Sequence, residues 1–327
     1  SSFNDHLYGD EKGNTLWGRD GVDALFGLKG DDVLEGGKGA DMLFGDVGSD
    51  TATYVSSTAR VVASLVTGIG TAGDADGDTY NGIENLTGSA FDDRLTGNAA
   101  VNILRGASGN DVLRGLAGDD TLYGGYGDDL LQGGAGADMI DGGLGGDTVS
   151  YAGATAGIVA NLAAPTGNTR DAAGDVYVSI ENLTGSDHND RLNGNTFENY
   201  IVGGAGNDVL NGGDASDRLR GGEGNDAFVF NSALDALANV DTILDYSVPD
   251  DRIWLDDAVF TTLTAGQGLG SAFANGSAAT TAAHRIIYNS VNGDLYYDAD
   301  GAGGADAILF ARIGAGLTMT AAEFLVV

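Results

Sequence analysis

Five aspartates recur at every ninth residue of a glycine-rich stretch: Asp111, Asp120, Asp129, Asp138 and Asp147. Each one closes a loop with the consensus pattern Gly-Gly-x-Gly-x-Asp, in which Ala107 and Leu116 replace the second glycine, and an apolar residue follows two positions later. Carboxylates at this spacing, together with the carbonyl groups of a glycine loop, supply only hard oxygen atoms. The chemistry that this pattern favours is the binding of a hard cation.

Each aspartate is position six of a nonapeptide, and the flanking positions indicate how the chain presents it. Glycine at positions one, two and four permits left-handed dihedrals, so that loop carbonyls can turn inward. Positions seven to nine predict a very short strand whose middle side chain points inward. Two nonapeptides then form one flattened coil, and residues 18 apart stack at roughly 4.8 Å. We therefore expect Asp111 beside Asp129, and Asp120 beside Asp138.

Stacked rows of carboxylates repel one another unless a cation lies between them. Ca²⁺ takes six to eight oxygen ligands at about 2.3–2.6 Å, whereas Mg²⁺ demands a stricter octahedron and retains its waters. The stacked pairs predict about 10 to 14 bound Ca²⁺ ions. These ions would neutralise most of the net charge of −33, which arises from 48 acidic and 15 basic residues. Because the apolar row is thin, we expect folding to depend on the metal.

The nonapeptide phase extends over three arrays, at residues 1–53, 84–150 and 181–230, with irregular inserts at 54–83 and 151–180. The segment IENLTGS occurs at 83–89 and again 97 residues later at 180–186, so the inserts also repeat. At 231–327 the glycine loops stop and apolar runs appear. Asn292-Gly293 there predicts a hairpin, and 319–325 predicts a short helix capped by Thr320. The first five residues align with 89–93, so we expect the protein to extend upstream.

The repeats resemble those of RTX calcium-binding proteins secreted by type I systems, including the C-terminal regions of serralysin-type proteases and mannuronan epimerases. The resemblance is most specific at 106–149 and 203–229. It implies an all-β fold, a parallel β-roll in three arrays, followed at 231–327 by a β-rich capping region that carries the secretion signal. It also implies that Ca²⁺ is bound by the position-six side chains and by loop carbonyls. In this family the Glu of an Ile-Glu-Asn motif is a ligand, which here corresponds to Glu84 and Glu181.

The side chains expected to bind Ca²⁺ are Asp5, Asp23, Asp32, Asp41, Asp50, Glu84, Asp93, Asn102, Asp111, Asp120, Asp129, Asp138, Asp147, Glu181, Asp190, Asn199, Asp208, Asp217 and Asp226. The backbone oxygens expected to bind it are those of Gly36, Lys38, Gly106, Ser108, Gly115, Ala117, Gly124, Gly125, Gly127, Gly133, Gly134, Gly136, Gly143, Gly145, Gly203, Gly204, Gly206, Gly222 and Gly224. The loops that contain Lys12, Ala100, Phe197 and Ala215 depart from the glycine pattern.

Composition excludes several classes of protein. There is no cysteine for a disulfide framework or a thiolate zinc site, and 56 Gly with 2 Pro is not collagen. The acidic charge disfavours binding to nucleic acid, and no apolar run is long enough for membrane insertion. The chain lacks the HExxH motif of serralysin-type proteases, and its three histidines are isolated, so the sequence predicts no enzyme activity.

One question about the inserts stays open. Their acidic turns (Asp74, Asp76 and Asp78; Asp171 and Asp175) are either solvated or additional metal ligands. Outside the inserts, Trp17 and Trp254 are expected to pack.

The sequence predicts a calcium-binding export and folding module of a secreted, extracellular protein. It would pass unfolded through the type I secretion machinery and fold on meeting Ca²⁺. The alternative is a calcium-dependent module that binds a polysaccharide or another cell surface. Outward-facing arginines, such as Arg105 and Arg218, fit that alternative or simple charge balance.

Overall fold

The computed structural model describes residues 1–327, and its regular structure is almost entirely β-strand. Its only helical segments are four single 3₁₀ turns, η1 (Gly73–Ala75), η2 (Arg170–Ala172), η3 (Gly270–Ala272) and η4 (Ala321–Glu323). None of these is long and apolar enough to cross a membrane. The chain divides into two compact units: unit 1 is Ser1–Tyr151 with Asp171–Ile180, and unit 2 is Ala152–Arg170 with Glu181–Val327.

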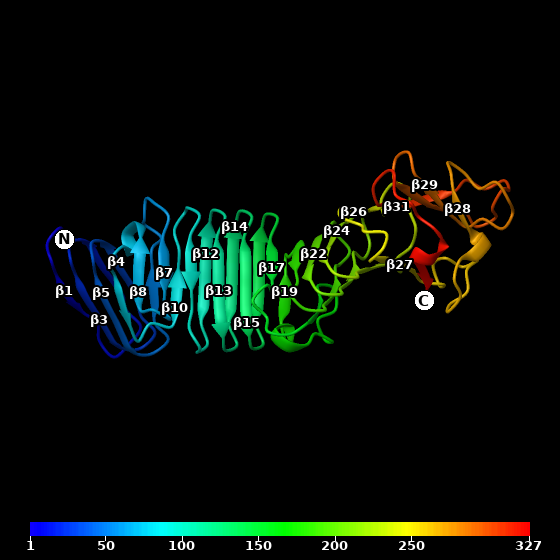
Figure 1. Ribbon diagram of the computed structural model, residues 1–327. Coiled ribbons are helices and arrows are strands. Elements are labelled where there is room, and N and C mark those ends of the chain that lie inside the picture. The colour runs from blue at the N-terminus through cyan, green and yellow to red at the C-terminus, as the bar shows by residue number, and fades with distance from the viewer. The chain divides into compact units, whose positions relative to one another are not determined.

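One sheet of unit 1 is entirely parallel, and its strands stack one after another along the unit (Figure 1). Its eight strands, in spatial order, are β2 (Thr15–Asp20), β4 (Val33–Lys38), β6 (Thr51–Thr53), β10 (Asn85–Thr87), β12 (Ile103–Ser108), β14 (Thr121–Tyr126), β16 (Met139–Leu144) and β19 (Val176–Val178). Leu104 pairs with Leu122, which confirms the predicted coil of 18 residues.

The other sheet of unit 1 is parallel except where the first insert joins it. Its strands are β1 (His6–Tyr8), β3 (Ala24–Lys29), β5 (Met42–Val47), β9 (Thr79–Asn81), β8 (Ile69–Ala72), β7 (Val62–Ser64), β11 (Arg94–Thr96), β13 (Val112–Ala117), β15 (Leu130–Ala135) and β17 (Thr148–Ser150). Strand β8 is antiparallel to β7 and β9. The insert at 54–83, which we expected to be irregular, therefore carries the sheet from the first array to the second.

Many strands are twice as long as the three residues that the pattern predicts. β12 covers six residues because the loop backbone pairs as well: Ala107 lies opposite Gly125, and Ser108 opposite Tyr126. The prediction was wrong because it assigned the glycine positions to the loop alone. An 18-residue repeat brings the loops of successive coils into register just as it does the strands.

In each unit the core of the roll is a row of apolar residues at position eight. Its members from the interior coils are fully buried: Leu25, Leu34, Leu43, Leu86, Leu95, Leu104, Leu113, Leu122, Leu131, Ile140, Leu183, Leu192, Ile201, Leu210 and Leu219. One apolar side chain per nine residues forms the column, as the periodicity predicts.

Unit 2 contains a parallel sheet of β18 (Val159–Asn161), β21 (Arg191–Asn193), β23 (Val209–Asn211), β25 (Ala227–Phe230), β27 (Arg252–Leu255) and β32 (Phe324–Val326). The strands of its other sheet are β20 (Asn182–Thr184), β22 (Tyr200–Ala205), β24 (Arg218–Glu223), β26 (Asp241–Ile243), β31 (Ile308–Arg312), β30 (Asp294–Tyr297), β29 (Ile286–Asn289) and β28 (Phe273–Asn275). In both sheets, strands of the last 97 residues continue the columns of the third array.

The C-terminal region adds an aromatic cluster to the leucine column. The ring of Phe310 lies 5.1 Å from that of Phe230 and 5.2 Å from that of Phe260. The predicted hairpin is present, because β29 and β30 are antiparallel around Asn292-Gly293. The predicted short helix is one 3₁₀ turn, η4, with Thr320 as its cap.

Candidate metal centre

The position-six carboxylates form continuous ladders along the roll. One oxygen of each, Oδ1, accepts the backbone N–H of the residue 18 positions earlier. Asp111 Oδ1 accepts from Asp93 N at 2.7 Å, and Asp129 Oδ1 accepts from Asp111 N at 2.7 Å. The same bond recurs in the neighbouring ladder, where Asp138 Oδ1 accepts from Asp120 N at 2.8 Å. The coil period therefore fixes each carboxylate between two coils, as the sequence predicts.

The second carboxylate oxygen, Oδ2, is buried and has no hydrogen-bond donor in most of these loops. The aspartates in question are Asp23, Asp32, Asp41, Asp50, Asp111, Asp120, Asp129, Asp138, Asp208, Asp217 and Asp226. Each of these side chains is at most 2% exposed. A buried carboxylate oxygen without a donor carries a desolvation cost that only a cation or a proton can offset.

Carbonyl oxygens converge on the same space. A β carbon added to Gly106 would collide with Asp111 Oδ2, and it would lie 2.7 Å from the carbonyl oxygen of Gly124 on the next coil. A side chain at Gly115 would likewise collide with Asp120 Oδ2 and would lie 2.7 Å from the Gly133 carbonyl oxygen. Position one is therefore glycine because oxygens from two coils fill the volume beside it. Oxygen atoms held this close suit a hard cation such as Ca²⁺.

Burial raises the pKa of these carboxyl groups. Desolvation, reinforced by neighbouring carboxylates, raises the pKa of Asp111 and of Asp120 to about 7, and that of Asp129 and of Asp138 to about 6. The backbone N–H that each group accepts opposes the shift but does not cancel it. Without a cation, the ionised form of the ladder is costly near neutral pH.

The ladders extend beyond the predicted residues and end inside both inserts. Asp41 N donates to Asp78 Oδ1 at 2.7 Å, and Asp138 N donates to Asp175 Oδ1 at 2.9 Å. Asp78 and Asp175 are buried, so they do not form a solvated turn. Their second oxygen accepts from a tyrosine hydroxyl, that of Tyr54 at 2.9 Å in the case of Asp78.

A tyrosine donor thus stands where other loops have an oxygen without a partner. Tyr151 donates to Asp175 Oδ2 at 2.6 Å in the same way. The signal in the sequence was the repeat of 97 residues, which relates Tyr54 to Tyr151 and Asp78 to Asp175.

In unit 2 the ladders end on two further aspartates that the sequence did not single out. Asp217 N donates to Asp241 Oδ1 and Asp226 N donates to Asp251 Oδ1, both at 3.0 Å. They lie 24 and 25 residues along the chain, outside the 18-residue period, so the spacing could not reveal them. Both belong to the C-terminal region.

Three predicted ligands lie at the edges of the ladders. Asp5 accepts from Ser1 Oγ at 2.7 Å and pairs with the N-terminal ammonium at 3.2 Å. Glu84 Oε2 accepts from Asp50 N at 2.9 Å, so that glutamate takes the place of the next aspartate. The carbonyl group of Glu181 accepts from the Asn199 side chain at 2.8 Å.

A second group of predicted ligands is already satisfied by the protein. Asp93 Oδ2 accepts from Ser89 N, and Asp190 Oδ2 accepts from Ser186 N at 2.5 Å. The side chain of Asn102 accepts from Asn98 N at 2.7 Å and donates to the Glu84 carbonyl at 2.8 Å.

Asn199 repeats the arrangement of Asn102. Its side chain accepts from Asn195 N at 2.8 Å. Geometry therefore separates these four residues from the aspartates with a buried, unpartnered oxygen.

No group of three or more His, Cys, Asp or Glu side chains gathers where it could hold a metal. A loop contains no more than two carboxylates, so backbone carbonyl oxygens would supply the remaining ligands of a bound Ca²⁺ ion. Neither a histidine nor a further acidic side chain joins them.

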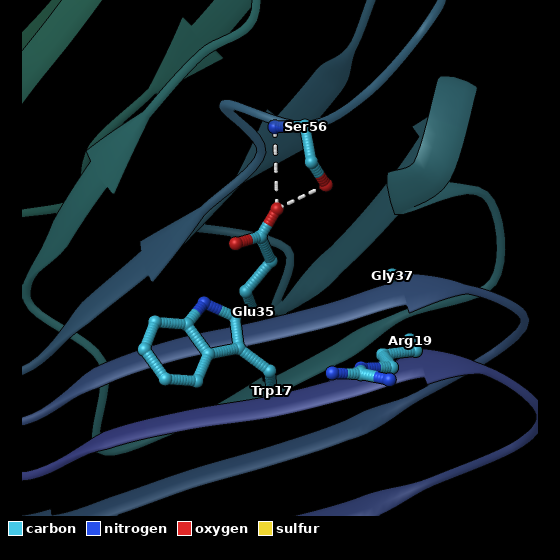
Figure 2. Close-up of a pocket in the computed structure, with 5 residues that line it drawn as sticks. All are labelled: Trp17, Arg19, Glu35, Gly37 and Ser56. Carbon is cyan, nitrogen blue, oxygen red and sulfur yellow. Dashed lines mark hydrogen bonds between the residues drawn. The ribbon is translucent and has the colours of Figure 1, made fainter. Parts of the chain in front are cut away.

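Trp17 does not pack, contrary to expectation: its side chain is 58% exposed on β2. Figure 2 shows the shallow pocket beside it, with Arg19 and Glu35 on neighbouring strands. Glu35 is held by two donors from Ser56, its backbone N–H at 3.2 Å and its hydroxyl. The pocket combines one exposed indole ring with charged groups.

A model of the RTX calcium-binding nonapeptide repeat (4 copies) matches residues 1–34, 17–52, 78–113, 114–149, 184–214 and 193–228. The matched segments cover more than half of the chain and coincide with the loops described above. No curated protein matches the chain.

Proposed function

Since the chain belongs to the RTX calcium-binding nonapeptide-repeat family, its cofactor is Ca²⁺, and we propose that it is the calcium-dependent folding module of a secreted protein. The observation that carries this proposal is the row of buried Oδ2 atoms without a donor. A stable fold does not retain so many desolvated acceptors unless a ligand satisfies them.

Calcium would be held between coils. In each site the Oδ2 atom of a position-six aspartate, such as Asp111, and loop carbonyls, such as those of Gly106 and Gly124, would form the oxygen cage. Bound Ca²⁺ supplies positive charge between carboxylates that otherwise repel, and it thereby compensates much of the net charge of −33. The protein's own part is to hold the oxygens at the coil spacing.

Folding would then depend on the calcium concentration. The leucine column offers one apolar side chain per nonapeptide, which is too little to offset the ordering of a chain with 56 glycines. Inside the cell, where free calcium is scarce, the chain would stay unfolded and pass through a type I secretion machinery. Outside, it would fold as the sites fill.

Residues 231–327 would cap the roll. Their strands β26 and β27 pair with β24 and β25 of the last coil. Asp241 and Asp251 accept the last ladder N–H groups. An uncapped solenoid would leave these groups exposed at an open sheet edge.

Circular dichroism tests the folding proposal directly. The chain in EDTA is expected to give the spectrum of a disordered protein, and addition of Ca²⁺ to millimolar levels is expected to produce the β signal. Mg²⁺ at the same concentration serves as the control and should be much less effective. A β spectrum in EDTA equal to that in calcium contradicts the proposal.

A second candidate function, calcium-dependent binding of a polysaccharide, is favoured by one observation. Aromatic rings stack along the N-terminal coils: the exposed Tyr8 stacks on the half-buried Phe26 at 4.7 Å, and Phe26 stacks on the half-buried Phe44 at 4.8 Å. Trp17 is exposed on the other sheet. Flat aromatic surfaces of this kind suit the faces of sugar rings. Titration with an alginate-like polymer at constant calcium, with Trp17→Ala as the variant, separates the two functions.

A further inference from the structure

The nonapeptide loops occur in two backbone states, which differ at position two. In one state the position-two residue has a positive φ. Its members are Arg19, Leu28, Gly37, Asp46, Ala107, Leu116, Gly125, Gly134, Gly143, Gly204, Gly213 and Gly222. In the other state φ is not positive, and the members are Asp10, Ser89, Asn98, Ser186 and Asn195. We name these states open and closed, respectively.

The state of position two matches the environment of the position-six side chain. The aspartates whose buried Oδ2 has no donor all lie in open loops. In every closed loop, the position-two N–H instead donates to the position-six side chain of the same loop. The distances are 2.6 Å from Asp10 to Asn14, 2.7 Å from Asn98 to Asn102, 2.5 Å from Ser186 to Asp190 and 2.8 Å from Asn195 to Asn199, and Ser89 donates to Asp93.

A second hydrogen bond holds the closed state. The side chain of each closed position-two residue accepts the N–H of position four. Ser89 Oγ accepts from Phe91 at 3.2 Å, and Asn98 Oδ1 accepts from Ala100 at 2.8 Å. The same bond occurs from Lys12 to Asp10 at 2.9 Å, from His188 to Ser186 at 3.1 Å and from Phe197 to Asn195 at 2.9 Å.

Position four completes the distinction. It is never glycine in a closed loop, whereas in the open loops it is glycine everywhere except at Ala215. Asp46 shows that position two alone is insufficient, because this Asp lies in an open loop and is followed by Gly48 at position four.

An inward N–H and a cation cannot share one carboxylate oxygen. The N–H satisfies the acceptor and directs a positive dipole at the space in which a metal would lie. Left-handed φ at Arg19, Leu28 or Leu116 is unfavourable for a residue with a β carbon, so it must be compensated locally. A cation bound to the Oδ2 atom freed by that conformation is such a compensation.

We propose that positions two and four decide which loops bind Ca²⁺, and that the closed loops of Asn14, Asp93, Asn102, Asp190 and Asn199 remain metal-free. This inference rests on the proposed calcium-binding function. It removes Asp93, Asn102, Asp190 and Asn199 from the set of calcium ligands, although two of them carry the expected carboxylate. The closed loops hold the first coils of the arrays without metal.

Opening a closed loop tests the proposal. In Ser89→Gly/Phe91→Gly, the loop of Asp93 gains the glycines of an open loop, and the carbonyl of Gly106 on the next coil already faces it. Phe91 is 44% exposed, so its removal leaves the core intact. The calcium content of the full chain at saturation, measured by equilibrium dialysis, is expected to rise by one ion. It should rise by two when Ser186→Gly/His188→Gly is added.

Matched variants separate the possible outcomes. Phe91→Ala keeps the Ser89 hydrogen bonds and should leave the calcium content unchanged. Leu116→Ser/Gly118→Ala closes the loop of Asp120 while keeping its carboxylate, and should remove one ion. A folded, opened variant with unchanged calcium content overturns the inference. If the opened variant does not fold, retention of full content by the closed Asp120 variant overturns it. Absence of calcium uptake by the wild-type chain instead contradicts the proposed function.

Discussion

At the scale of single residues, the two oxygens of one carboxylate have different roles. Asp217 Oδ1 accepts from Asn199 N at 2.8 Å and thereby joins two coils, whereas its Oδ2 is buried without a donor. The first oxygen contributes to the fold with or without metal. The second makes the metal-free fold costly, because a desolvated acceptor is left unpaired. The calcium dependence that we propose therefore arises from one atom in each open loop.

Substitution of Asp217 by Asn should remove one calcium site. The amide keeps one oxygen that can accept the ladder N–H, but it removes the negative charge that would bind Ca²⁺. The chain should bind one fewer ion, and at calcium ten times above the Kd its stability should fall by about 1.4 kcal/mol. Equilibrium dialysis measures the number of bound ions, and urea unfolding at that calcium concentration measures the stability. Asp214→Asn, on the exposed position three of the same loop, is the control and should change neither.

Acid should partly replace calcium in folding the chain. The pKa of Asp111 and of Asp208 is raised to about 7 in the metal-free fold, from 3.8 in the unfolded chain. Between these values the folded state holds protons that the unfolded chain has released. Its stability is therefore greatest below pH 4 and declines as the pH rises through 7.

In EDTA, the β signal should consequently grow as the pH is lowered from 7.5 towards 4.5. Calcium affinity should fall over the same range, because protons and Ca²⁺ compete for one oxygen. A metal-free chain whose β content does not change with pH contradicts this prediction. A second titration in 1 M salt separates it from simple screening of the net charge.

At the scale of elements, the insert at 54–83 is a structural joint between the first and second arrays. In unit 1, β7, β8 and β9 replace a coil, and the antiparallel β8 accommodates a chain that leaves the 18-residue period. The ladder of the first array ends in this joint, because Asp78 accepts from Asp41 N while its own N–H donates to the Ala75 carbonyl. Its second oxygen accepts from Tyr54, which takes the role that a cation would have in the open loops.

Replacing Tyr54 by Phe should destabilise this joint even at saturating calcium. Asp78 Oδ2 would lose a buried donor, and Tyr80 would lose its partner at 2.6 Å. The expected cost is about 1–3 kcal/mol, measured by urea unfolding at millimolar calcium. Tyr8→Phe removes a hydroxyl from an exposed ring and should cost far less. Equal stability of the two variants would show that the tyrosine donor does not support the joint.

At the scale of the whole molecule, the last 97 residues continue both sheets of unit 2. Strands β26 and β31 follow β24 in one sheet, β27 and β32 follow β25 in the other, and aromatic rings pack in the core between them. Under the proposed function the arrays would depend on metal, whereas the C-terminal region adds a cluster of packed aromatic rings.

Deletion of 231–327 should greatly slow or abolish calcium-induced folding. The N–H groups of Asp217 and Asp226 would lose their acceptors, and β24 and β25 would become open edges. Stopped-flow mixing with calcium measures the rate, with the intact chain as the reference. Leu237→Ala, in an exposed loop of the same region, should fold at the wild-type rate. Normal folding of the truncated chain would count against a capping role.

The sequence by itself determined the repeating part of the molecule. A strict period of nine residues determines which residues stack. Counting along the chain therefore predicts that Leu104 lies beside Leu122 and that Asp111 lies beside Asp129. The same period explains glycine at position one. Each loop faces the corresponding loop of the next coil, whose carbonyl oxygen occupies the space that a β carbon would need. Periodic contacts are local in this sense, and no tertiary information is required to place them.

Tertiary structure alone decided what lies outside the period or depends on one torsion angle. Asp78 and Asp241 join the ladders at 37 and 24 residues, where only the folded path of an insert brings them into line. Asp93 and Asp111 both occupy position six of their loops. The backbone N–H at position two donates to the Asp93 carboxylate, whereas the Oδ2 atom of Asp111 has no donor. The residue type supplies the ligand, and the conformation of its loop decides whether that ligand is free to bind.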